Sequence, residues 1–109
     1  MIRKETSADL TGPQRPVRSG DTRVTVTFEL PATLWAGDVA VVGEFNGWNP
    51  HSHRLAQDRD GAWRLSLELE PGRRYEFRYL VDGREWANDW AADDYVPNRS
   101  GGFNSVLRT

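Results

Sequence analysis

The sequence contains no cysteine, one methionine and two histidines in 109 residues. Without thiols there can be no disulfide framework and no thiolate metal site, so packing has to hold the fold together. No apolar run approaches the roughly 20 residues of a membrane span. Residues 1–20 also lack the apolar centre of a secretory signal. We therefore expect a cytoplasmic protein with no membrane among its partners.

Clustered positive charge is also missing. The net charge is −2. Residues 1–20 carry four basic and two acidic side chains (+2), and residues 21–109 carry ten basic and fourteen acidic ones (−4). A surface that binds phosphates needs a concentration of positive charge, so this distribution argues against nucleic acid as a partner.

The chain length suits one domain. Residues 1–20 combine prolines and glycines with scattered charges and almost no apolar periodicity. This composition is typical of a disordered tail. We expect residues 21–109 to form the folded domain.

Helical periodicity is absent, whereas a period of two runs through most of the domain. It predicts strands whose inward-facing side chains are 24/26/28/30, 63/65/67/69 and 75/77/79. Residues 38–45 are apolar at both parities, which predicts a central strand buried on both sides. Asp82-Gly83 indicates a hairpin turn, and a last short strand is expected at 105–109.

Short strands at about ten-residue spacing, separated by turn residues, are typical of a β-sandwich. We therefore predict an all-β domain with about seven to eight short antiparallel strands.

Residues capable of catalysis are few and lie in predicted loops. The pairs to consider are His51/His53, Asp58/Asp60 and Asp93/Asp94. The histidines have no obvious third metal ligand nearby. Paired carboxylates catalyse proton transfer only if their environments separate their pKa values. We expect these side chains to be solvated, and we expect no enzyme activity, metal or cofactor.

Five tryptophans are the unusual feature of the composition. Trp63 falls within an alternating strand and is expected in the core, and Trp35 is expected to plug one end of it. Trp48, Trp86 and Trp90 fall outside the alternation. Each of these three could fold back as a cap or remain exposed. An exposed indole beside asparagine and arginine suits a sugar, whose flat apolar face stacks on the ring.

Several motifs occur in an order that resembles carbohydrate-binding module family 48. They are GEFNGW, DGAWRLSLELEPG, YEFRYLVDG with a following tryptophan, and GGFNSVL. The resemblance covers about residues 21–109. The family includes the isoamylase N-terminal early-set domain and the glycogen-binding domain of AMP-activated protein kinase β subunits. It implies an immunoglobulin-like (early-set) β-sandwich.

The resemblance also implies a site for α-1,4-linked glucan. The stacking tryptophans would be Trp48 and Trp86, and Arg78 and Asn104 would bond sugar hydroxyls. Two features depart from the kinase domain: two residues rather than one separate V-D-G from the tryptophan, and Ser100 replaces a bulky apolar residue. Trp90 has no assignable counterpart.

The additional residue leaves two hairpin registers open. A two-residue loop, Asp82-Gly83, pairs Tyr79 with Trp86 and turns the indole towards the core. A three-residue loop over residues 81–83 pairs Arg78 with Trp86 on the outer face. We favour the second register because it keeps the arginine and the tryptophan together.

The expected function is non-catalytic binding of an α-glucan such as glycogen, starch or maltodextrin. A glucan-metabolising enzyme or another protein is a further candidate partner. The alternative function is a protein-interaction or structural module that has lost sugar binding.

Overall fold

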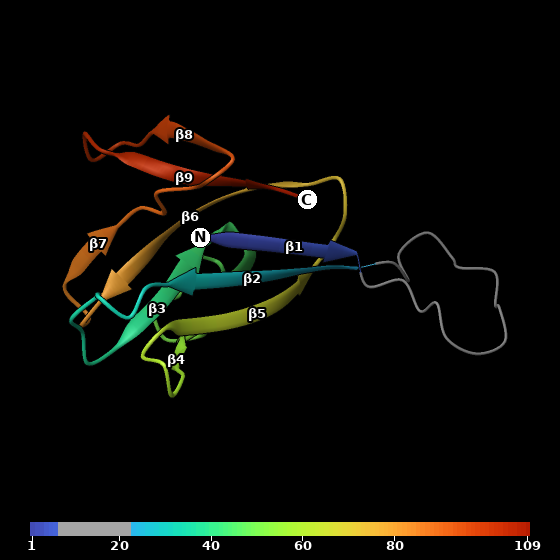
Figure 1. The fold of residues 1–109 in the computed structure, drawn as a ribbon. Helices are drawn as coiled ribbons and strands as arrows, with labels where there is room; N and C mark the ends of the chain where they lie inside the picture. Colours follow the sequence, from blue (N-terminus) through green and yellow to red (C-terminus); the bar gives the residue numbers. More distant parts are fainter. Residues whose placement is uncertain (7–22) are drawn as a thin grey trace, which may run out of the picture.

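The computed structural model describes residues 1–6 and 23–109 (Figure 1). Within them the chain forms nine strands and one short 3-10 helix, η1 (Glu44–Asn46). The strands are β1 (Ile2–Thr6), β2 (Val24–Leu30), β3 (Val39–Gly43), β4 (Ala56–Gln57), β5 (Trp63–Leu69), β6 (Arg74–Val81), β7 (Glu85–Ala87), β8 (Asp94–Pro97) and β9 (Phe103–Arg108).

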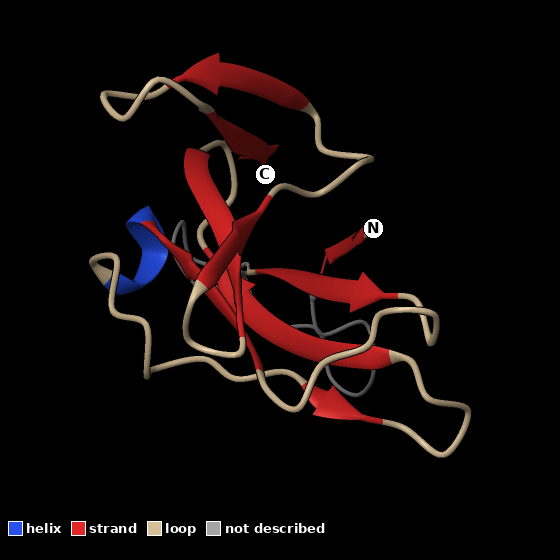
Figure 2. Cartoon of the chain, turned by 90° about the vertical axis from the view of Figure 1, so that its left-hand side faces the viewer, coloured by secondary structure: helices blue, strands red, loops and turns tan. Residues whose placement is uncertain are grey.

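These strands make two antiparallel sheets. Sheet A has the order β1-β2-β5-β4, and sheet B has the order β3-β6-β9-β8, with β7 also paired to β6. Figure 2 shows how strands and loops make up the described part of the chain, with η1 as its one helical segment. The predicted all-β sandwich is confirmed.

The core lies between the inner faces of the two sheets, as the alternation predicted. Val26 and Phe28 of β2 meet Phe77 and Tyr79 of β6, and all four side chains are completely buried. The rings of Phe28 and Phe77 lie edge to face with centroids 5.3 Å apart, a favourable aromatic geometry. Trp63 is 5% exposed and belongs to this core, which confirms its predicted position.

β3 is buried along its whole length, as predicted, but it is not a central strand. It lies at the end of sheet B and pairs with β6. The other edge of β3 is covered by residues 53–55. The Val41 N–H donates to the His53 carbonyl (2.9 Å), and the Leu55 N–H donates to the Val39 carbonyl (2.8 Å). A returning loop thus protects an edge that would otherwise expose unpaired backbone groups.

The prediction of a disordered tail over residues 1–20 is wrong for Ile2–Thr6, which form β1. This strand pairs with β2, with Lys4 opposite Val26. Ile2 packs against the core, and Lys4 forms an ion pair with Asp93. Charged residues concealed the strand because an edge strand with one wet face needs few apolar side chains. The rest of the predicted tail lies outside the described residues.

Candidate functional site

The segment that carries Trp48 leaves β3 through a tight turn. Asn46 holds this turn: its Oδ1 accepts from the Gly43 N–H (3.1 Å) and its Nδ2 donates to the Val41 carbonyl (3.0 Å). Gly47 and Trp48 have φ angles of 63° and 60°, both in the left-handed region. Trp48 remains 40% exposed. A bulky residue rarely adopts this backbone conformation, so the turn presents the indole at a conformational cost.

Gly43 allows this turn to lie directly against β6. A Cβ atom at position 43 would come within 2.6 Å of both the Glu76 carbonyl oxygen and the Phe77 Cβ. Only glycine fits such a close approach. The lack of a side chain at Gly43 therefore brings the Trp48 turn next to the middle of sheet B.

The β6–β7 hairpin has a register that neither hypothesis described. Its loop comprises residues 82–84, so Leu80 pairs with Trp86 and Val81 with Glu85. Asp82 and Gly83 both have positive φ, and the Arg84 N–H donates to the Val81 carbonyl (3.1 Å). Arg84 then stays outside the ladder as an additional residue.

The predicted pairing of Arg78 with Trp86 is therefore wrong, but the prediction that both side chains lie on the outer face is correct. The observed register differs from the favoured one by two residues, and a shift of two preserves the face to which a side chain points. Trp86 lies with Arg78 on the outer face of sheet B and is 47% exposed. The alternative, with its indole turned towards the core, is excluded.

Arg78 and Trp86 are in direct contact on this outer face. The Arg78 guanidinium carbon lies 4.9 Å from the centroid of the indole, a cation–π distance. Leu80, the residue paired with Trp86, belongs to a small buried cluster with Ala40 and Val42 on the same face of the sheet.

Asn104 belongs to β9, which pairs with the first half of β6 as β7 pairs with its end, and its amide is already engaged. Its Oδ1 accepts from Asn98 Nδ2 (3.2 Å), and its Nδ2 donates to Glu76 Oε1 (3.1 Å). Asn98 Oδ1 in turn accepts the N–H groups of Ser100 and Gly102. Asn104 is therefore held in place by neighbours that could also bond a ligand.

The four predicted residues come together as two pairs on one face. Trp48 and Asn104 line a single hollow of about 680 Å³, which we call the Trp48 hollow. Arg78 extends towards the same region, because a Cβ placed at Gly102 would lie 3.9 Å from Arg78 Nη1 and 3.6 Å from Asn98 Nδ2.

Sequence reasoning missed the other residues that line this hollow: Glu44, Glu76, Pro97, Asn98 and Arg99. Glu76 lies two residues before Arg78 on the same strand, so the alternation could have placed it on the same outer face. The remaining positions depend on how the β8–β9 hairpin folds, and the periodicity had not indicated β8.

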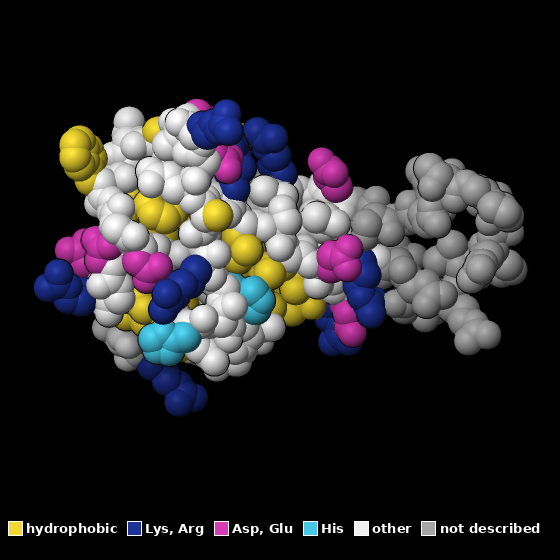
Figure 3. Space-filling view, turned by 90° about the horizontal axis from the view of Figure 1, so that it is seen from below, with side chains coloured by type: hydrophobic (Ala, Val, Ile, Leu, Met, Phe, Trp, Pro, Cys, Tyr) yellow, Lys and Arg dark blue, Asp and Glu magenta, His cyan; other side chains and the backbone are white. Residues whose placement is uncertain are grey.

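Trp35 and Trp90 do not line this hollow. Trp35 is 95% exposed, so the prediction that it plugs the core is wrong. The adjacent backbone is fixed instead, because Asp82 Oδ1 accepts from the N–H groups of Gly37 (2.7 Å) and Asp38 (3.0 Å). Trp90 is 72% exposed. Figure 3 shows hydrophobic side chains reaching the surface in separate patches between charged ones.

The candidate acid–base carboxylates have charged partners. Burial by itself would raise the pKa of Asp93, but hydrogen bonds from Lys4 and from the Arg108 backbone lower it overall. A backbone hydrogen bond from Tyr95 and a side-chain bond from Arg108 lower the pKa of Asp94. Both shifts favour the ionised carboxylate, so neither group is held protonated as a general acid.

The two histidines of the predicted loop lie in different surroundings. His53 Nδ1 lies 3.0 Å from Asn46 Nδ2, so this ring helps to hold the Trp48 turn. His51 lines a different hollow, beside Leu80 and Asp82. Among residues 1–6 and 23–109, no group of three or more potential ligand side chains is placed to hold a metal ion.

Comparison with known protein families shows to which family the domain belongs. The profile of carbohydrate-binding module 48 (isoamylase N-terminal domain) matches residues 21–96. The chain belongs to carbohydrate-binding module family 48. The resemblance inferred from the motifs is thus confirmed. Three of the four predicted site residues lie within the matched part of this family 48 module, and Asn104 lies beyond it.

The relatives of this family 48 module include several 1,4-alpha-glucan branching enzymes. GlgB 2 of Xanthomonas campestris pv. campestris (strain 8004) is 45% identical over 64 residues, which cover 51% of this chain and 9% of the enzyme. GlgB of Deinococcus radiodurans is 32% identical over 86 residues, which cover 75% of this chain and 12% of the enzyme. The chain thus corresponds to about a tenth of the length of these relatives. Within its described residues, no helix is long and apolar enough to cross a membrane.

Proposed function

We propose that this module binds α-1,4-linked glucan without acting on it chemically. Trp48 and Trp86 would provide stacking surfaces for the sugar rings, and Arg78 and Asn104 would bond the hydroxyl groups. Glycogen, starch and maltodextrins share this chemistry. The names of the branching-enzyme relatives agree with an α-glucan ligand. A cytoplasmic location is part of this proposal.

The observation that carries the proposal is the exposed Arg78–Trp86 pair on the outer face of sheet B. An indole that is 47% exposed offers a flat apolar surface. The guanidinium at 4.9 Å supplies fixed hydrogen-bond donors next to it. Trp48 and Asn104 add a second ring and an amide in the adjoining hollow.

Affinity for a single chain should be modest. Burying an aromatic side chain is worth roughly 1.5–3 kcal/mol. Two such rings, less the cost of ordering the sugar, correspond to a dissociation constant from about millimolar to tens of micromolar.

Affinity electrophoresis in a glycogen gel tests the proposal with Trp48→Ala. Glycogen should retard the wild-type protein, and Trp48→Ala should migrate nearly as in a gel without glycogen. Trp35→Ala is the matched control, because it removes an indole that is more exposed but lies outside the hollow. If glycogen leaves the mobility of the wild type unchanged, the proposal is wrong.

A second candidate function is a protein-interaction module. Trp35 and Trp90 favour it, since they are 95% and 72% exposed and do not line the Trp48 hollow. Under this candidate, maltoheptaose would leave the tryptophan fluorescence of the protein unchanged. Under glucan binding, maltoheptaose would alter the emission and reduce quenching by a soluble quencher.

A further inference from the structure

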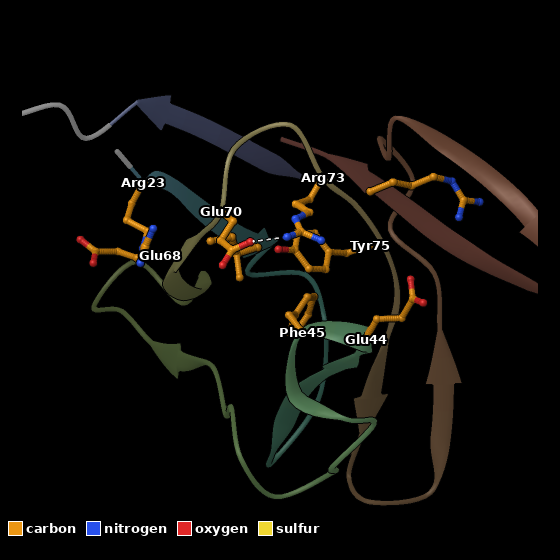
Figure 4. A pocket seen from close by; sticks show the side chains of 9 residues that line it. Arg23, Glu44, Phe45, Glu68, Glu70, Arg73 and Tyr75 are labelled. Carbon is orange, nitrogen blue, oxygen red and sulfur yellow. Dashed lines mark ion pairs between the residues drawn. The ribbon is translucent and has the colours of Figure 1, made fainter. Parts of the chain in front are cut away.

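A second hollow lies where β6 begins, with a volume of about 580 Å³. Figure 4 shows it between η1, the end of β5 and the start of β6. Its lining residues are Arg23, Glu44, Phe45, Glu68, Leu69, Glu70, Arg73, Arg74 and Tyr75. We refer to it as the Tyr75 hollow. No role was predicted for these residues.

The Tyr75 hollow adjoins the Trp48 hollow, because Glu44 lines both. Glu44 Oε1 accepts from the Glu76 N–H (2.6 Å), so its carboxylate is fixed at the boundary. Strand β6 passes both hollows. Four residues separate Arg74 from Arg78, a distance of about 13 Å along a strand. A chain of a few sugars could therefore reach from one hollow to the other.

The base of the Tyr75 hollow is aromatic. The rings of Phe45 and Tyr75 have centroids 6.0 Å apart, and both side chains pack against the core. In Figure 4 the side chains of Arg73 and Glu70 lie near Tyr75. Packing against the core gives the rings a fixed position, as a stacking surface requires.

The charges around the hollow balance, with three arginines and three glutamates among the lining residues. Arg73 pairs with Glu70 (2.8 Å), and Arg74 pairs with Glu76 (3.2 Å). An anion would meet three carboxylates here. A neutral polyhydroxyl ligand can instead donate to the carboxylates and accept from the guanidinium groups. The lining therefore suits a sugar better than a phosphate.

We propose that the Tyr75 hollow is a second sugar subsite for the glucan chain that lies on Trp48 and Trp86. This inference rests on the proposed function. It makes the module selective for chain length: a short oligosaccharide fills the tryptophan surface only, and a longer one also enters the Tyr75 hollow.

Titration calorimetry with maltotriose and maltoheptaose tests this selectivity. Glu70→Gln with Arg73→Gln removes one exposed ion pair and keeps the net charge. This variant should bind maltoheptaose about fivefold more weakly, the loss expected for about one hydrogen bond. Its affinity for maltotriose should stay within about twofold of the wild type, which also shows that the variant is folded.

The control is Arg64→Gln with Asp58→Asn, which removes the Arg64–Asp58 ion pair at sheet A together with the Arg64 contacts to Glu29 and Asp60. It should leave both affinities unchanged. A measurement without substitutions is the NMR spectrum of the wild type, in which maltoheptaose should shift the Tyr75 ring resonances and maltotriose should not.

Equal maltoheptaose affinity in the wild type and the Glu70/Arg73 variant would overturn the second subsite alone. Unshifted Tyr75 resonances in saturating maltoheptaose would do the same. If the wild type binds neither oligosaccharide, the proposed function fails and the subsite fails with it.

Discussion

The outer faces of the two sheets differ in how their side chains are satisfied. On sheet A, the Thr27 and Ser66 hydroxyl oxygens lie 2.8 Å apart, and Arg64 Nε donates to Glu29 (2.7 Å). On sheet B, Arg78 lies against an indole that is still half-exposed. Both sheets bury an inner face, and sheet B also buries Ala40, Val42 and Leu80 on its outer side. Among the described residues, sheet B alone presents exposed aromatic surface on its outer face.

This difference indicates where a sugar can bind at little cost. On sheet A a ligand would have to replace hydrogen bonds that the protein already makes, so the net gain would be small. On sheet B the Asn104 amide is likewise engaged, but a ligand would also cover apolar ring surface that is in contact with water. The proposed function thus depends on the contrast between the two faces.

Replacing Trp86 should cause the largest loss of sugar affinity and so remove the difference between the two faces. Trp86→Ala removes a stacking surface and should weaken maltoheptaose binding about 10- to 100-fold, since a buried aromatic side chain is worth roughly 1.5–3 kcal/mol. The matched change on sheet A, Thr27→Ala with Ser66→Ala, should leave the affinity unchanged. Titration calorimetry with maltoheptaose measures the affinity of both variants. Comparable losses of affinity would show that the two faces do not differ as proposed.

Arg78 gives the intermediate effect. Arg78→Gln keeps a hydrogen-bonding amide but loses the charge and the cation–π contact, so we expect roughly threefold to tenfold weaker binding of maltoheptaose. Arg54 provides the control, because it is an exposed arginine that does not line the Trp48 hollow. Arg54→Gln should bind like the wild type. An Arg78→Gln protein with wild-type affinity would remove Arg78 from the site.

The smallest expected effect is on the stability of the fold, and it concerns the ion pair between Arg64 and Glu29 on sheet A. The hydrogen bond from Arg64 lowers the pKa of Glu29 below its ordinary value of 4.5. A lowered pKa in the folded state means that the ionised carboxylate stabilises the fold above the unfolded-state pKa. This contribution is lost as the pH falls through the folded-state pKa.

Urea unfolding at pH 6 and at pH 3 measures this contribution. The midpoint of the wild type should fall slightly more between the two pH values than that of Arg64→Gln, which lacks the donor. Asp93 and Asp94 titrate in both proteins, so the difference between them reports the carboxylates that pair with Arg64, which are Glu29, Asp58 and Asp60. Parallel changes in the two midpoints would contradict this account.

Period-two alternation predicted the inner faces and the core position of Trp63, since burial of one face is a local property of a strand. It could not place β3 at the end of a sheet, because burial on its outer side comes from residues 53–55, which return from a distant turn. Nor could it show β1, where a single apolar residue, Ile2, reaches the core.

The predictions for the tryptophans were only partly correct, also because some of them depended on the conformation of loops. The alternation of side chains along the strand predicted the face on which Trp86 lies. The residue of β6 that pairs with Trp86 depends instead on whether Arg84 pairs with β6 or stays in the loop. The local conformation of the turn decides this. Trp35 precedes a buried strand and was expected inside. Its loop is instead held by backbone bonds to Asp82, so the indole is not needed to close the core.

The backbone at Trp48 places stability and recognition in opposition. At a φ of 60°, glycine or asparagine would relax the turn, whereas only a large ring provides the stacking surface. Selection for a more stable domain alone would therefore tend to remove the side chain on which the proposed sugar site depends. A small residue would therefore be expected here in a module that serves only as a scaffold, and a tryptophan in one that binds sugar.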